Sequence, residues 1–96
     1  MKIRNITHKA LRRLHTTDSA KGLPAECVPK LRNMLAFLQD MEAPEELVNL
    51  PTWKAHRLTG TRTGAWSLHV TRNWRPTFWI DTDEPSVCDL DFEDYH

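Results

Sequence analysis

The sequence offers little that would cross-link the chain or fix it in a membrane. It has only two cysteines, Cys27 and Cys88, and they match no metal-site spacing, so no disulfide framework can be inferred. No apolar run is long enough to span a bilayer, and the first residues lack the apolar segment of a signal peptide. We therefore expect a cytoplasmic protein with reduced thiols and no contact with membranes.

The histidines form no metal-binding pattern. None of them pairs with a cysteine or an acid at the usual ligand spacings. They are His8, His15, His56, His69 and His96. The sequence therefore predicts no metal and no other cofactor.

Net charge is also absent, because 13 Lys and Arg balance 13 Asp and Glu. A net positive field, which many nucleic-acid-binding proteins have, is thereby excluded. The charges are nevertheless segregated: bases dominate residues 1–38 and acids dominate residues 81–96. This distribution fits either a local basic patch or solvated faces that neutralise one another.

The length of 96 residues allows one domain, residues 1–96, with a modest core. Its first half predicts helices. After a possible strand at residues 2–6, Thr7 suits an N-cap for a helix that starts at His8, and a polar loop follows at 16–22. Residues 28–38 carry the strongest helical periodicity. Pro29 predicts a kink there or a separate first turn, and Pro44 predicts another short helical turn.

The second half predicts strands at residues 53–58, 65–71, 74–80 and 87–92. Alternation is clearest in the second run, where one face would carry Trp66, Leu68 and Val70 and the other Ser67, His69 and Thr71. Pro76 predicts a bulge or a nitrogen that faces an unpaired side. The expected fold class is α+β, with two N-terminal helices packed on a twisted, mostly antiparallel sheet. Expected core residues are Cys27, Trp66, Leu68, Trp74 and Phe78.

The central strands also carry cations, and no acid lies between Thr52 and Ile80. The basic residues of this stretch are Lys54, Arg57, Arg62, Arg72 and Arg75. We expect a sheet with an apolar back and a cationic front.

Residues suited to RNA cleavage without a metal accompany these cations. His56, Arg75 and the end of the chain, residues 93–96, combine imidazoles, a guanidinium and carboxylates. Cleavage requires a base for the ribose 2′-OH proton, a cation for the phosphoryl charge and an acid for the departing oxygen. Arginine suits the second task, since its planar fork binds two oxygens at once.

At these residues the sequence resembles the HigB toxins of the RelE/ParE superfamily. The similar segments are KALRRL (9–14), RLTG (57–60), GAWSL (64–68), NWRPTF (73–78) and EDYH (93–96). The resemblance covers essentially the whole chain. It implies a RelE-like fold with two helices on a small twisted sheet, and a ribosome-dependent mRNA interferase neutralised by a helix-turn-helix antitoxin of the HigA type. The protein would contact DNA only indirectly, through that antitoxin, and it would bind mRNA and the small ribosomal subunit directly.

The resemblance also implies functions for individual residues. The implied catalytic residues are His56, Arg75, Asp94, Tyr95 and His96. His56 and His96 would transfer the protons, and the sequence does not assign which of them is the acid and which the base. Arg75 would stabilise the phosphate. Asp94 would orient a histidine or hold the chain end, and Tyr95 would position a nucleotide. The expected RNA-binding residues are Lys54, Arg57, Arg62 and Arg72.

Three departures from the family pattern keep other functions open. Thr59 and Thr61 stand where relatives carry Lys-Gly-Asp, Pro76 replaces an aliphatic residue, and the net charge is zero. A non-catalytic gyrase inhibitor of the ParE type, or a weakened toxin retained as an antitoxin-binding co-repressor, is therefore the alternative.

Overall fold

The computed structural model of the chain describes residues 1–94. Its helices are α1 (Lys9–Thr17), α2 (Val28–Asp40) and α3 (Glu45–Val48). Its strands are β1 (Lys2–Ile3), β2 (His56–Arg57), β3 (Trp66–Ser67), β4 (Trp74–Asp81) and β5 (Ser86–Asp94). Single 3₁₀ turns lie at Ala25–Cys27, Pro51–Trp53 and Gly60–Arg62.

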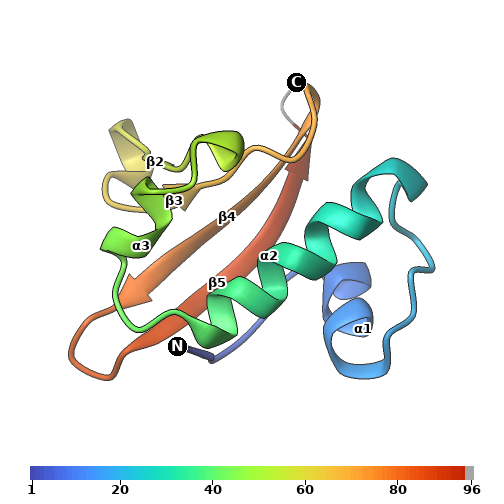
Figure 1. Cartoon of the computed structure of the whole chain (residues 1–96), viewed down its shortest axis with the longest axis horizontal. Coiled ribbons are helices and arrows are strands. Elements are labelled where there is room, and N and C mark those ends of the chain that lie inside the picture. Colours follow the sequence, from blue (N-terminus) through green and yellow to red (C-terminus); the bar gives the residue numbers. More distant parts are fainter. Residues whose placement is uncertain (95–96) are drawn as a thin grey trace.

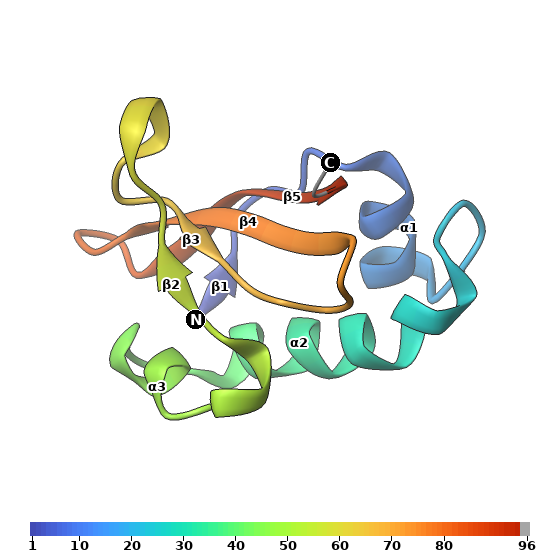
Figure 2. The same cartoon turned by 90° about the horizontal axis from the view of Figure 1, so that it is seen from above.

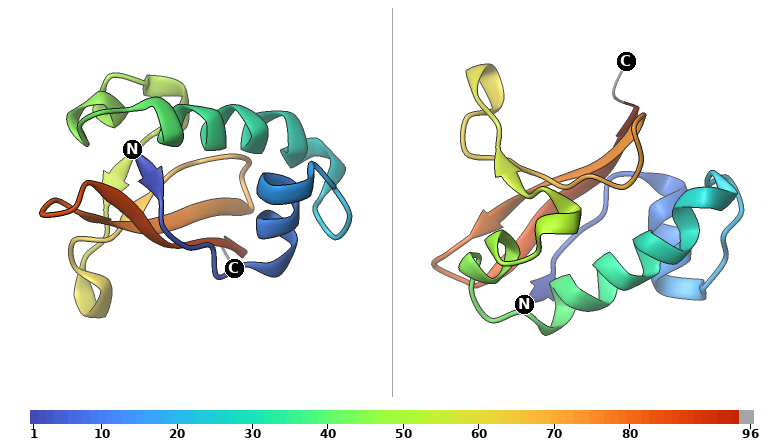
Figure 3. Two further views of the ribbon diagram at one scale, coloured as in Figure 1. Left: turned by 90° about the horizontal axis from the view of Figure 1, so that it is seen from below. Right: turned by 45° about the horizontal axis from the view of Figure 1, so that its top comes forward.

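The strands form one sheet in the order β1-β5-β4-β3-β2 (Figure 1). β1 runs parallel to β5, and the other neighbouring pairs are antiparallel. α2 and α3 lie on one side of the sheet, whereas the Gly60–Arg62 turn projects from the other (Figure 2). Two further views show the same separation (Figure 3). The expected α+β fold is confirmed, with one face of the sheet covered by helices.

The start of α1 differs from the prediction that Thr7 caps the helix. The N-cap is His8, whose Nδ1 accepts a hydrogen bond from the Leu11 N–H at 3.1 Å. Thr7 is engaged by β5 instead, since its N–H and its hydroxyl both donate to the Leu90 carbonyl. The helix also runs through Thr17, so the predicted loop at 16–22 begins later.

The second helix follows the prediction. A separate 3₁₀ turn, Ala25–Cys27, precedes α2, and Pro29 stands within the first turn of that helix. Its missing N–H costs nothing there, because the first N–H groups of a helix have no partner within it. At the other end the Met1 ammonium donates to the Gln39 carbonyl at 2.6 Å, a favourable place for a positive charge.

Two of the predicted central strands are shorter than expected. β2 holds only two residues, because Pro51–Trp53 is a 3₁₀ turn and Lys54 has a left-handed backbone, φ 45°. β3 ends at Ser67, yet its continuation stays hydrogen-bonded to β4 through Leu68 N–H to Pro76 O at 3.0 Å and Val70 N–H to Trp74 O at 3.2 Å.

Pro76 is accommodated without a bulge of its own. It stands opposite Phe92 in register, and the irregularity between β4 and β5 lies between Thr77 and Trp79. The Pro76 carbonyl accepts a hydrogen bond from the Leu68 N–H, and the nitrogen and carbonyl of one strand residue point to the same neighbour. The proline nitrogen therefore faces Leu68, the residue that follows β3. The predicted irregularity is therefore present in this run, just after Pro76, and the proline nitrogen faces the hydrogen-bonded continuation of β3 rather than an unpaired side.

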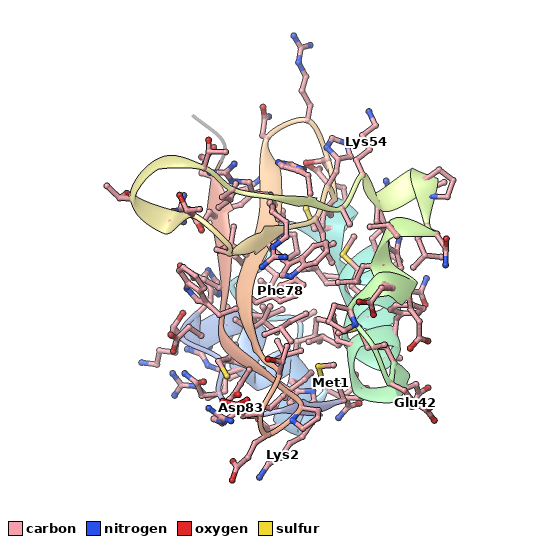
Figure 4. The ribbon with its side chains drawn as sticks, turned by 90° about the vertical axis from the view of Figure 1, so that its left-hand side faces the viewer. Met1, Lys2, Glu42, Lys54, Phe78 and Asp83 are labelled. Atoms are coloured by element: carbon pink, nitrogen blue, oxygen red, sulfur yellow. The ribbon has the colours of Figure 1, made fainter. Side chains whose placement is uncertain are left out.

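The core lies between the sheet and the helices (Figure 4). Trp66, Leu68, Phe78 and Cys27 are buried, as predicted, whereas Trp74 is half-buried and stacks on Phe92 with ring centroids 4.8 Å apart. Trp79 is 39% exposed. No helix within residues 1–94 is both long and apolar enough to cross a membrane.

Candidate active site

The register of the sheet decides which side chains share its outer face, the face turned away from α2. Opposed residues of antiparallel strands lie on the same face. His56 is opposite Ser67, and Ser67 is opposite Thr77. In the next row Arg75 is opposite Glu93.

His69 belongs to that second row. The two backbone bonds on either side of it, from Leu68 to Pro76 and from Val70 to Trp74, place His69 directly opposite Arg75. Such a pair, without backbone bonds between its own members, brings its side chains especially close. The outer face thus carries His56 and His69 on neighbouring strands, with Arg75 beside them.

A depression opens over these rows, and we call it the outer groove. It has a volume of about 410 Å³ and is lined by Lys54, His56, Ser67, Leu68, His69, Arg72 and Arg75. Four residues that the sequence suggested therefore meet in one place: His56 and Arg75 from the catalytic set, and Lys54 and Arg72 from the RNA-binding set. Two imidazoles and three cations around one groove suit the binding of a phosphodiester anion.

His56 lines the outer groove with an exposed side chain, and its ring is oriented by the backbone. Its Nδ1 lies 3.0 Å from the Lys54 carbonyl oxygen. A carbonyl can only accept, so Nδ1 carries the proton in this contact and Nε2 is the nitrogen that remains for a substrate. Lys54 itself has a left-handed backbone, φ 45°.

His69 is the residue of the outer groove that the sequence did not identify as functional. It is half-buried, and its backbone N–H donates to the Trp53 carbonyl at 2.7 Å. Burial lowers the pKa of His69, and the charges of Lys54 and Lys30 lower it further. The alternation of residues 66–71 puts His69 on the face opposite Trp66. This position on the polar face is the feature of the sequence that points to His69.

Glu93 is a second residue to which the sequence assigned no function of its own. Its carboxylate accepts from Arg62 at 2.7 Å and from the Thr77 hydroxyl, and it lies 4.0 Å from Arg75. Burial by itself would raise the pKa of Glu93, but the bonds from Arg62 and Thr77 and the charges of Arg62 and Arg75 outweigh it, so the pKa is lowered. Glu93 thus anchors the row that holds Arg75, whose side chain is 18% exposed.

The other predicted RNA-binding residues lie outside the groove. Arg57 points to the opposite face, since it pairs with Trp66 and its guanidinium lies 5.2 Å from that ring. It borders a separate pocket beside α3 of about 290 Å³. Arg62 sits on the Gly60–Arg62 turn and is held by Glu93.

The chain end is only partly within the described residues. Asp94 is exposed and stands opposite Trp74 at the end of β5, so its register position belongs to the helix-covered face rather than to that of Arg75. Tyr95 and His96 lie outside the described residues.

One buried polar group in the groove suggests a ligand. The Ser67 side chain is 1% exposed, and within residues 1–94 its hydroxyl has no hydrogen-bond partner. Buried hydroxyls normally have a partner, so a hydroxyl beside two imidazoles is a place for a polar substrate atom. As for metals, no three His, Cys, Asp or Glu side chains of that same range lie together in a way that could hold an ion.

Comparison with known proteins finds a family that matches the chain. The family model described as "RelE-like toxin of type II toxin-antitoxin system HigB" matches residues 4–96. "Endoribonuclease HigB" of Proteus vulgaris is 34% identical over 94 residues, which is 98% of this chain and 99% of that protein.

Two crystal structures share the fold. The structure of YafQ from E. coli strain BL21(DE3) superposes with a TM-score of 0.58 at 14% identity, covering 95% of this chain and 92% of YafQ. A mutant of YafQ from E. coli gives 0.53 at 16% identity, with the same coverage. At such identities these two comparisons bear on the fold alone.

Proposed function

This chain belongs to the HigB-like family of RelE-like toxins of type II toxin–antitoxin systems, and on that premise we propose that it is an endoribonuclease that cleaves mRNA on the ribosome. The whole chain, residues 1–96, would act as a single toxin domain. Cleavage of the message would inhibit translation.

The observation that carries the proposal is the outer groove itself. His56 and Arg75, which lie 19 positions apart along the chain, line one depression together with Lys54 and Arg72. A similarity of sequence does not by itself bring these side chains together, whereas cleavage of a phosphodiester requires a proton-handling group and a cation at one place.

The chemistry needs only side chains of these types. The proton of the ribose 2′-OH passes to a base, the 2′-oxygen forms a bond to phosphorus, and the bond from phosphorus to the 5′-oxygen breaks. An acid returns a proton to that 5′-oxygen, which leaves a 2′,3′-cyclic phosphate and a 5′-OH. Arg75 would hold the phosphoryl oxygens as their charge increases.

Each proposed residue then has a task. His56 and His96 would serve as the proton-handling pair, with Nε2 of His56 as the reacting nitrogen. Tyr95 would position a nucleotide and Asp94 would orient a histidine or hold the chain end. Lys54 and Arg72 would attract the RNA backbone at the groove, and Arg57 and Arg62 would contact more distant phosphates.

Membership in a toxin–antitoxin family implies an antitoxin partner. We propose that this partner is a helix-turn-helix protein of the HigA type, that DNA is met only through it, and that the remaining partners are mRNA and the small ribosomal subunit in the cytoplasm. The gyrase-inhibitor alternative receives no support from the family match.

Induction of the protein in cells followed by mapping of mRNA 5′ ends tests the proposal. The expected result is cuts in phase with codons, abolished by His56→Ala and by His96→Ala but retained in His15→Ala, which alters a histidine on α1. Supercoiling defects without cuts would support the gyrase inhibitor, and growth arrest without either effect would contradict both.

A further inference from the structure

His69 has no task in the reaction described above, although it lines the outer groove together with His56 and Arg75. It is opposite Arg75 across the β3–β4 hairpin and diagonal to His56 across β2 and β3. Directly opposed side chains have Cβ atoms about 4.5–5.5 Å apart, close enough for two side chains to contact one small anion.

The backbone holds His69 in that position. Three main-chain bonds fix the segment: His69 N–H to Trp53 O at 2.7 Å, and the bonds of Leu68 and Val70 to β4. The Lys30 ammonium of α2 also donates to the Val70 carbonyl at 2.9 Å. A group held this firmly loses little freedom when it binds, which favours a binding contact.

We propose that His69 is a further phosphate-binding residue of this site, and that it contacts the same phosphoryl group as Arg75. This inference rests on the proposed function, because the anion would be a phosphate of the RNA. The hydroxyl of Ser67, two residues along the same face, has no hydrogen-bond partner within residues 1–94 and would give that anion or its ribose a third contact.

The groups around His69 make the charge of its imidazole depend on whether an anion is bound. Its charged or titratable neighbours come from α2, from the segment 54–56, from the loop between β3 and β4, and from β4 and β5. They are Lys30, Lys54, His56, Arg72, Arg75 and, beyond Arg75, Glu93. Burial and the cations oppose a charged imidazole in the empty groove. A bound phosphate offsets that repulsion, so the pKa of His69 should rise on binding and a proton should be taken up.

The sign of the pH dependence follows. Below the raised pKa of the complex the imidazolium donates to the phosphate, and as pH rises through that pKa the charged contact is lost. The Michaelis constant for ribosome-bound mRNA should therefore increase with pH. A glutamine at this position keeps a neutral donor but cannot become charged.

Steady-state cleavage of mRNA on programmed ribosomes, at pH 6.5 and pH 8.0, compares His69→Gln with the matched control His15→Gln. We expect KM for His69→Gln to be about tenfold above the control at the lower pH, equivalent to about 1.4 kcal/mol, with kcat little changed and with the difference smaller at the higher pH. A fall in kcat at unchanged KM, or no change in either constant, overturns the inference while the nuclease function stands.

A second measurement does not depend on cleavage. The ring signals of His69, assigned by their loss in His69→Gln, are titrated by NMR with and without inorganic phosphate, chloride serving as the control anion. A phosphate-dependent rise in the pKa of His69 supports the inference. A titration that is the same in both anions overturns it, even if the protein fails to cut any message.

Discussion

Replacement of Arg75 by lysine separates the geometry of the guanidinium from its charge. Arg75 lines the outer groove between His69 and Glu93, and its side chain is 18% exposed. Lysine keeps the positive charge and much of the stem, but it offers a point charge in place of a planar fork with two parallel donors. Arg75→Lys should therefore remove one oriented bond to the phosphoryl group and leave the general attraction for RNA.

The magnitude follows from the energy of that bond. A hydrogen bond to a charged group contributes about 1.5–3 kcal/mol, and each 1.4 kcal/mol is about tenfold in a rate or equilibrium constant. We expect kcat/KM to fall by about 10- to 100-fold. The fold should survive, because Glu93 keeps its bonds from Arg62 and Thr77.

The assay is cleavage of mRNA on programmed ribosomes, with kcat/KM measured from initial rates. The control is Arg32→Lys, which alters an arginine of α2 that pairs with Asp18 in the helical layer. Its activity should equal that of the wild type, and thermal unfolding should show both variants folded. Full activity of Arg75→Lys would refute the view that the fork of Arg75 holds the phosphate.

Three further predictions concern the scaffold of the groove. Phe78→Ala, at a side chain that is 1% exposed, should lower the free energy of unfolding by about 3–5 kcal/mol; a loss below about 1 kcal/mol in urea titrations would refute the placement of Phe78 in the core. Gly64→Ala should cost about 1–2 kcal/mol, because Gly64 has φ 98°, and equal thermal stability of the two proteins would contradict this backbone conformation. The lowered pKa of Glu93 means that the folded protein binds this proton less tightly than the unfolded chain. The stabilisation is thus complete above the unfolded value of about 4.3 and is lost as pH falls through the folded pKa; unfolding free energies between pH 3 and 7 should show this slope, and Glu93→Gln should reduce it.

The sequence was sufficient for the apolar side of the sheet. The alternation of Trp66, Leu68 and Val70 predicts a buried face, and these three side chains are buried. The periodicity of residues 28–38 likewise predicts α2, and Pro29 allows the separate turn that precedes it. Both patterns are local, so neighbouring residues alone determine them.

Which side chains meet on the polar face of the sheet depends on the register between strands, and the sequence does not show that register. His69 faces Arg75 because the hairpin from Leu68 to Pro76 closes in one particular register. Lys54 has a left-handed backbone just before the short strand β2, and its carbonyl contacts the His56 ring. Neither feature has a local pattern, since no glycine or turn dipeptide marks Lys54.

Arg57 illustrates a signal that was available but not used. His56 and Arg57 are adjacent in one strand, so their side chains must point to opposite faces. Once His56 is assigned to the outer groove, Arg57 cannot line it as well, and the structure places Arg57 over Trp66 instead. The pleat therefore divides the predicted cations into two groups.

The most direct test of the central claim, cleavage by attack of the ribose 2′-OH within the outer groove, uses a message with a single altered atom. An mRNA with 2′-deoxyribose at the nucleotide on the 5′ side of the mapped cut is presented to the purified protein on programmed ribosomes, beside the all-ribose message. We predict that the all-ribose message is cut to a 5′-OH end and that the 2′-deoxy message is left intact. Cleavage of both messages at the same position and rate would contradict the mechanism.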